Sequence, residues 1–134
     1  MNQTQRPTLV TIIAAMTLAS GIVNVFWGAI ASQGALASVV GFVCVPFTIL
    51  PTVLGIFEIL YAAKLFGAPG QAARPSTSIA AFEIATILAG NAFSMVVGIL
   101  ALVFYNDLAV KGYFDGMTAP GPAPVEPAPS QPED

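Results

Sequence analysis

Glu58 and Glu83 are the side chains most able to do chemistry in this sequence, because each lies in a long apolar stretch. Ionisable residues inside a membrane span are costly and often mark a proton or ion pathway. The two glutamates flank one loop, on helices expected to run antiparallel, so they should lie at similar depth. One interpretation is therefore a proton or ion site formed by this pair.

A second interpretation, which the sequence favours, places Glu58 and Glu83 at the membrane surface. About 20 residues suffice to cross the hydrocarbon layer, and each glutamate lies near the far limit of that length within its stretch. Both carboxylates would then lie on helix ends that protrude toward the loop. There they would have a structural role and could pair with Lys64 or Arg74.

Two asparagines are the other polar side chains inside apolar sequence. Asn91 is expected at the depth of Pro51, whose missing N–H leaves the carbonyl of Phe47 without its helical donor. The Asn91 amide could bond to that carbonyl, which makes it a structural clamp at a kink rather than a ligand contact. Asn24 is expected to hydrogen-bond across helices, for about 1 kcal/mol.

Residues for most other kinds of site are missing. The chain has no histidine, and its one cysteine, Cys44, lies in apolar sequence. No nucleophile–base pair, metal cluster or phosphate loop is visible, so we expect no enzymatic activity, no cofactor and no identifiable small-molecule ligand. A nucleic-acid partner is excluded because the four basic residues are scattered along the chain.

The composition predicts a membrane protein. Of the 134 residues, 56% are hydrophobic and only 8% are charged, whereas about 25% of a soluble domain is usually charged. A surface with so few charges would aggregate in water. The lipid bilayer is therefore the expected environment, and the length supports one domain.

The apolar stretches predict an all-α bundle of three transmembrane helices with a disordered, acidic, proline-rich tail. The expected parts are a short N-terminal segment 1–8, a bundle 9–114 with spans 9–31, 35–66 and 78–105 and an interfacial helix 106–114, and a tail 115–134. The first stretch exceeds the ~7–15-residue core of a signal peptide, so we expect it to remain as a span.

The second stretch, 35–66, contains Pro46 and Pro51, and each proline removes a helical hydrogen bond. It is either one long kinked helix or two half-helices that meet near the prolines. Each half would have about 15 residues and measure ~22 Å, which is too short to cross the membrane. We therefore favour one kinked helix, with a four-span arrangement as the alternative.

The basic residues set the expected orientation. With three spans, Arg6, Lys64 and Arg74 share one side and Lys111 lies on the other. The positive-inside rule then places the N-terminus in the cytoplasm and the tail outside. With four spans both termini would lie inside.

Small residues recur every four positions and predict packing faces. They are Ser20, Asn24 and Gly28 in the first span, and Gly90, Ser94 and Gly98 in the third. Such stripes let helix backbones approach closely within lipid. They would serve packing within the chain or association with a partner subunit.

The segments 6–13, 53–65 and 98–104, with Tyr113 and Phe114, resemble small bacterial multi-span membrane proteins of no known activity. The likeness covers most of residues 6–114. It implies residence in the bacterial cytoplasmic membrane and carries no activity over to this chain.

The sequence thus favours a non-catalytic accessory or scaffold subunit, which packs against itself as a homo-oligomer or against another membrane protein. The alternative is an oligomeric proton- or ion-coupled transport element that uses Glu58 and Glu83. Three spans are too few to enclose a pathway within one chain, so this alternative requires several copies.

Overall fold

A computed structural model describes residues 6–67 and 74–118, and all the regular structure in these residues is helical. The elements are α1 (Thr8–Leu36), α2 (Val39–Phe66), α3 (Thr77–Ala85), the 3₁₀ helix η1 (Thr86–Ala89), α4 (Ala92–Tyr105) and α5 (Leu108–Thr118). The predicted all-helical class is confirmed. The expectations for residues 1–5, 68–73 and 119–134, which include most of the tail, lie outside the described residues.

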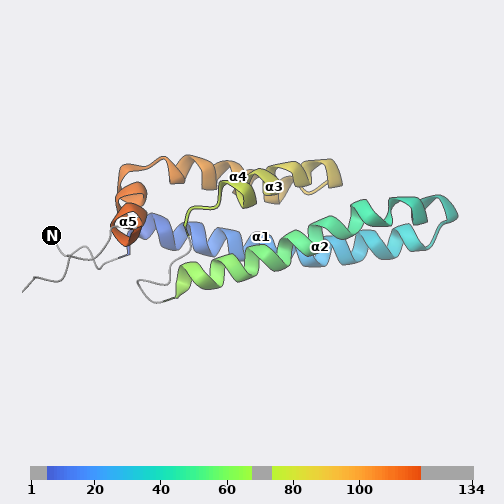
Figure 1. The fold of residues 1–134 in the computed structure, drawn as a ribbon. Coiled ribbons are helices and arrows are strands. Elements are labelled where there is room, and N and C mark those ends of the chain that lie inside the picture. Colours follow the sequence, from blue (N-terminus) through green and yellow to red (C-terminus); the bar gives the residue numbers. More distant parts are fainter. Residues whose placement is uncertain (1–5, 68–73, 119–134) are drawn as a thin grey trace, which may run out of the picture.

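Helices α1 and α2 form a long antiparallel hairpin (Figure 1). Its turn is tight because Ser38 caps α2, accepting a hydrogen bond from the Gly41 N–H at 2.9 Å. Both helices are long and apolar enough to cross a membrane. Helix α2 continues without interruption through Pro46 and Pro51, and the kink at these prolines stays a prediction.

The predicted third span, 78–105, is not one helix. Helix α3 and η1 run in one direction, the chain turns at Gly90, and α4 returns beside α3 (Figure 1). Gly90 has φ of 80°, a left-handed conformation that glycine adopts without steric cost. The prediction that Gly90 lies on a packing face is therefore wrong, because Gly90 is the turn residue of a helical hairpin.

Glycines let the helices of the two hairpins approach closely. A Cβ atom on Gly21 would lie 2.8 Å from the carbonyl oxygen of Gly55, and one on Gly28 would lie 2.7 Å from the backbone nitrogen of Thr52. On α4, a Cβ atom on Gly98 would lie 2.8 Å from the Cβ of Glu83. Side chains at these positions would force the backbones apart.

One end of the bundle carries the main apolar core. Helix α5 bends by 75° from α4 and lies across this end (Figure 1). The helix reaches Thr118, further than the predicted end at 114, and its residues Val110, Tyr113 and Phe114 are buried. The buried cluster is Val10, Ile13, Ala14, Tyr61, Leu65, Ala80, Ala101, Tyr105, Val110, Tyr113 and Phe114.

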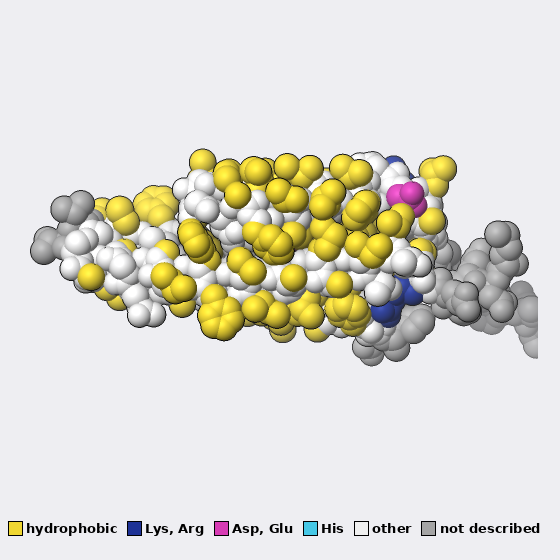
Figure 2. All heavy atoms as spheres, turned by 180° about the vertical axis from the view of Figure 1, so that it is seen from behind, with side chains coloured by type: hydrophobic (Ala, Val, Ile, Leu, Met, Phe, Trp, Pro, Cys, Tyr) yellow, Lys and Arg dark blue, Asp and Glu magenta, His cyan; other side chains and the backbone are white. Residues whose placement is uncertain are grey.

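The surface separates charge from apolar side chains. On the face drawn in Figure 2, hydrophobic side chains cover most of the length, and the charged side chains gather at one end. Helix α5 lies at this end. So does the contact in which the Arg6 guanidinium donates to the Gly67 carbonyl. Large hydrophobic side chains are exposed along α1, α2, α3 and α4 alike, as expected for helices that face lipid.

The close approach of α1 and α2 yields a first prediction. Gly55→Ala should lower the free energy of unfolding by about 1–3 kcal/mol, because the added methyl group overpacks a backbone contact. Thermal unfolding in mild detergent, followed by circular dichroism, measures the change. Gly34→Ala is the matched control, since a Cβ atom there meets nothing within 4 Å. Equal stability of Gly55→Ala and Gly34→Ala would contradict the packing described above.

Candidate functional site

The centre of the bundle holds a cluster of buried polar side chains, which begins with Glu58 on α2. Glu58 has 0% of its surface exposed, as has Asn24 on α1. The Asn24 Nδ2 donates to both carboxylate oxygens of Glu58, at 2.9 and 3.0 Å. The two residues come together because Gly21 and Gly55 allow α1 and α2 to lie in backbone contact at the same level.

Asn91 connects the second hairpin to this pair. Its Nδ2 donates to the Asn24 Oδ1 at 2.6 Å and to the Ser94 Oγ at 2.9 Å, while its Oδ1 accepts from the Ser94 N–H and so caps α4. The predicted bond from Asn91 to the carbonyl of Phe47 is absent, since these contacts occupy the amide. Asn91 therefore joins α4 to α1 and does not clamp α2.

Two serines extend the cluster. The Ser20 Oγ on α1 donates to the Ser94 Oγ on α4 at 2.9 Å, and both side chains are fully buried. Ser20 also lies beside the carboxyl groups of Glu58 and Glu83. Two of the residues predicted to form small-residue packing stripes are thus part of a polar contact between helices.

Glu83 is the exceptional member of the cluster. It is 0% exposed, and neither of its carboxylate oxygens has a hydrogen-bond partner among the described residues. The Ser20 hydroxyl lies beside it but donates to Ser94, and the charged group that interacts with it is Glu58. An unpaired carboxylate in such a place is expensive, because burial removes the water that would solvate its charge.

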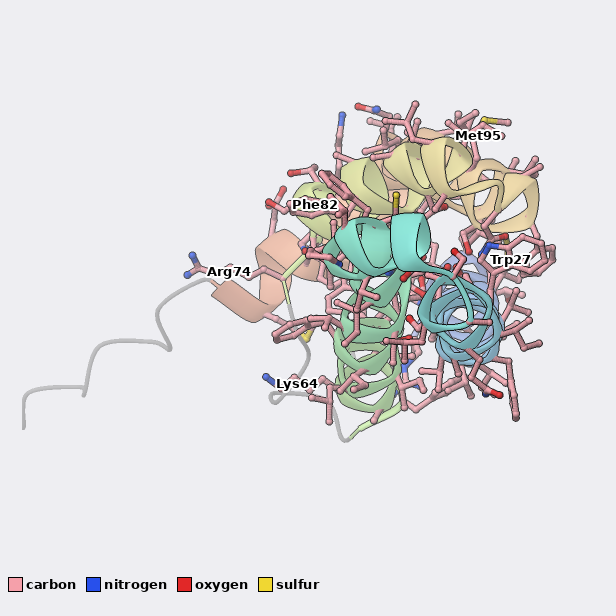
Figure 3. All side chains as sticks on the ribbon, turned by 90° about the vertical axis from the view of Figure 1, so that its right-hand side faces the viewer. Trp27, Lys64, Arg74, Phe82 and Met95 are labelled. Carbon is pink, nitrogen blue, oxygen red and sulfur yellow. The ribbon has the colours of Figure 1, made fainter. Side chains whose placement is uncertain are left out.

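No basic side chain compensates the two carboxyl groups. Lys64 and Arg74 are exposed and point away from the bundle (Figure 3). The sequence favoured surface positions for Glu58 and Glu83, in which these cations would pair with them. That interpretation is wrong, since both glutamates are fully buried and the charged group that interacts with Glu83 is Glu58.

A pair of tyrosines lies between the carboxyl groups and the end of the bundle that carries the charges. The Tyr61 and Tyr105 hydroxyls are 2.9 Å apart, and both side chains are buried. The Tyr61 hydroxyl also accepts from the Ser76 N–H and donates to the Arg74 carbonyl, each at 3.1 Å. Both tyrosines lie within electrostatic range of Glu83.

The tip of the second hairpin closes the other side of the cluster. The Trp27 Nε1 on α1 donates to the Ala89 carbonyl at 2.8 Å, and the Thr86 hydroxyl donates to the Glu83 carbonyl at 2.5 Å. Backbone bonds from Gly90 and Asn91 complete the turn. These bonds satisfy polar groups of the non-helical backbone at the tip.

The cluster offers carboxyl, amide and hydroxyl groups in a closed space. Residues 6–67 and 74–118 contain no group of three or more metal-binding side chains of the types His, Cys, Asp and Glu. Cys44 is exposed and lies apart from the cluster. Buried carboxyl pairs of this kind are found at proton and ion sites in membrane proteins.

No family model, no curated protein and no solved structure matches this chain.

Sequence reasoning found part of this site and missed the rest. Glu58, Glu83, Asn24 and Asn91 stood out because polar residues are rare in the apolar stretches. The tyrosine pair was missed. Its only signal was a tyrosine near each helix end, which is equally typical of an aromatic belt at the membrane surface.

The contact between Asn24 and Glu58 yields a second prediction. Asn24→Leu should be strongly destabilising, because it leaves a buried carboxylate without its donor. In Asn24→Leu/Glu58→Met both partners are apolar, so the double variant should be more stable than the sum of the single effects by about 0.5–3 kcal/mol. Unfolding in mild detergent measures this coupling.

Thr11→Leu, on the exposed face of α1, is the control for the change of hydropathy in that helix. Its effect should stay within about 0.5 kcal/mol. Strict additivity of Asn24→Leu and Glu58→Met would mean that the amide and the carboxyl group do not interact.

Proposed function

We propose that this protein is a small proton- or cation-coupled transport element of a membrane, and that Glu58 and Glu83 bind the coupling ion. The observation that supports it most is Glu83, which is fully buried with both oxygens unpartnered and with a second carboxyl group beside it. A residue of this kind destabilises the fold unless a ligand occupies it. Intramembrane carboxyl groups commonly serve as ion or proton sites for this reason.

The proposed topology is two spans and a re-entrant hairpin. With about 1.5 Å per residue, α1 measures about 44 Å, whereas the α3–η1 segment and α4 measure only about 20 Å each against a ~30 Å hydrocarbon layer. The short hairpin would enter the membrane and return to the side from which it came. A third span, by length and composition, would require α4 and α5 to act as one in spite of their 75° bend.

The charges support this topology. Helix α5, with Lys111, lies at the same end as Arg6 and the carboxyl end of α2, with Lys64. Arg74 lies beside the Tyr61 hydroxyl at this end. The positive-inside rule then places both ends of the described chain in the cytoplasm. The three-span expectation had placed Lys111 alone on the opposite side.

The topology yields a third prediction. A reporter fused to the C-terminus should be active in the cytoplasm, and so should one fused to the N-terminus, because an even number of crossings separates them. A reporter inserted between Ala37 and Ser38, in the turn that joins α1 to α2, should be active only outside the cytoplasm. It serves as the control. A C-terminus on the outer side would favour three spans and overturn the re-entrant hairpin.

Ion coupling yields a fourth prediction. Purified protein in liposomes, under an imposed membrane potential, should move protons or a monovalent cation at a rate that depends on protein density, because one chain is too small to enclose a pathway. Glu58→Gln and Glu83→Gln should each abolish this flux, since a neutral amide cannot exchange an ion. Dyes sensitive to pH and to alkali cations, trapped in the liposomes, measure it.

Asp115→Asn is the matched control for flux, because it removes an exposed acid on α5 outside the cluster. Equal flux in the wild type and both glutamine variants would remove the carboxyl pair from transport. Absence of flux under proton, sodium and potassium gradients would overturn the transport proposal as a whole.

A second candidate function is the accessory or scaffold subunit that the sequence favoured. One observation supports it: an apolar groove of about 560 Å³ lies between α2 and the α3–η1 segment, lined by Phe47, Leu54, Phe57, Phe82, Leu88 and neighbouring residues. The lining side chains Phe47 and Leu88 are exposed, and the α1–α2 hairpin extends beyond the tip of the second hairpin (Figure 1). Isolation in mild detergent of a monomer without a partner would count against this function.

A further inference from the structure

The occupant of the carboxyl pair is the question that the proposed function leaves open. The relevant groups come from four helices. They are Ser20 and Asn24 of α1, Glu58 and Tyr61 of α2, Glu83 of α3, Asn91 at the N-cap of α4, and Ser94 and Tyr105 within α4. Of these, only the two glutamates and the two tyrosines titrate, and the exposed Lys64 and Arg74 face away.

The geometry is unfavourable for a metal or alkali cation. Hard cations need about six oxygen ligands. Both oxygens of Glu58 already accept from the Asn24 amide, so an N–H group lies where a cation would have to bind. The Asn24 Oδ1 is occupied by the Asn91 amide. The two oxygens of Glu83 are the only carboxylate oxygens in the cluster without a partner.

A proton fits the same geometry. One proton removes one of the two buried negative charges, and it converts Glu83 from an acceptor into an O–H donor that can bond to a neighbour. Glu58 is the natural holder of the remaining charge, because two hydrogen bonds from Asn24 stabilise its ionised form. Two close carboxyl groups that share one proton are a known arrangement.

The two tyrosines interact electrostatically with Glu83 and lie on the side of the cluster toward the basic residues. Tyr105 bonds to Tyr61, and Tyr61 bonds to the backbone at Arg74 and Ser76, next to an exposed side chain. On the opposite side the cluster ends at Trp27 and the tip of the second hairpin, whose described backbone groups are bonded to one another. The connection therefore leads to the end of the bundle that carries the basic residues.

We propose that Glu58 and Glu83 share one exchangeable proton, held mainly on Glu83, and that it exchanges with the cytoplasmic side through the Tyr61–Tyr105 pair. This inference rests on the proposed function and names its coupling ion. It makes the site specific for protons, with the amide of Asn24 excluding other cations.

The test uses dicyclohexylcarbodiimide, an apolar reagent, on the full chain in detergent or liposomes. A protonated carboxyl group transfers its proton to a nitrogen of the reagent, the carboxylate adds to the central carbon, and rearrangement gives a stable N-acylurea. Mass spectrometry of the intact protein and its peptides should find one adduct, on Glu83, that is lost in Glu83→Gln and retained in Asp115→Asn. The labelling should fall as the pH rises and should not respond to sodium or potassium.

Infrared spectroscopy gives a second measurement that does not depend on access of the reagent. The wild type should show the C=O band of one protonated carboxyl group, which Glu83→Gln removes. After a pH jump the band should change more slowly in Tyr61→Phe and Tyr105→Phe than in the wild type. Tyr113→Phe is the control, because the Tyr113 hydroxyl is buried nearby but has no bond to the pair.

Protection of Glu83 by sodium or potassium, or the absence of a protonated carboxyl band from the folded protein, would overturn the shared proton. Unchanged kinetics in both tyrosine variants would overturn the connection. These results can be distinguished from a failure of transport. A protonated-carboxyl band that depends on pH, without flux, would contradict only the proposed function. Flux of sodium or potassium without the protonated-carboxyl band would contradict only the shared proton.

Discussion

Asn24 holds together the three parts of this bundle. It lies on α1, donates both hydrogen bonds that Glu58 of α2 receives, and accepts one from Asn91 at the start of α4. In lipid no water replaces a lost hydrogen-bond partner. Loss of any one of these three side chains would therefore leave the others with unsatisfied polar groups. The relative position of the two hairpins follows from this network, because the apolar surfaces alone gain little from packing against helices rather than lipid.

The glycines make that network possible. Gly21 and Gly55 bring α1 and α2 into backbone contact beside Glu58, and Gly98 does the same for α4 beside Glu83. A carboxyl group can reach the middle of such a bundle only where a neighbouring helix has no side chain in its way. The close contacts therefore serve the polar centre as well as the packing.

Hydropathy was sufficient to predict the helical class and the two long helices, and the rarity of polar residues in apolar sequence singled out Glu58 and Glu83. The reversal at Gly90 was not predicted, because an apolar stretch of span length has the same hydropathy whether it crosses the membrane or folds back on itself. A local signal did exist: glycine followed by asparagine is typical of one helix ending and another being capped. The wrong prediction of surface glutamates followed from missing this reversal, since a straight third helix would have carried Glu83 to the surface.

The short second hairpin also limits what one chain can do. It covers Glu58 and Glu83 from one side, and its tip ends beside Trp27, about two thirds of the way along α1. Beyond the tip, α1 and α2 continue alone, with apolar side chains exposed along them. A polar centre connected to only one end is a binding site rather than a channel. The transport that we propose therefore requires a second element that opens the other end. We propose that another copy of the chain supplies it at the uncovered part of α1 and α2.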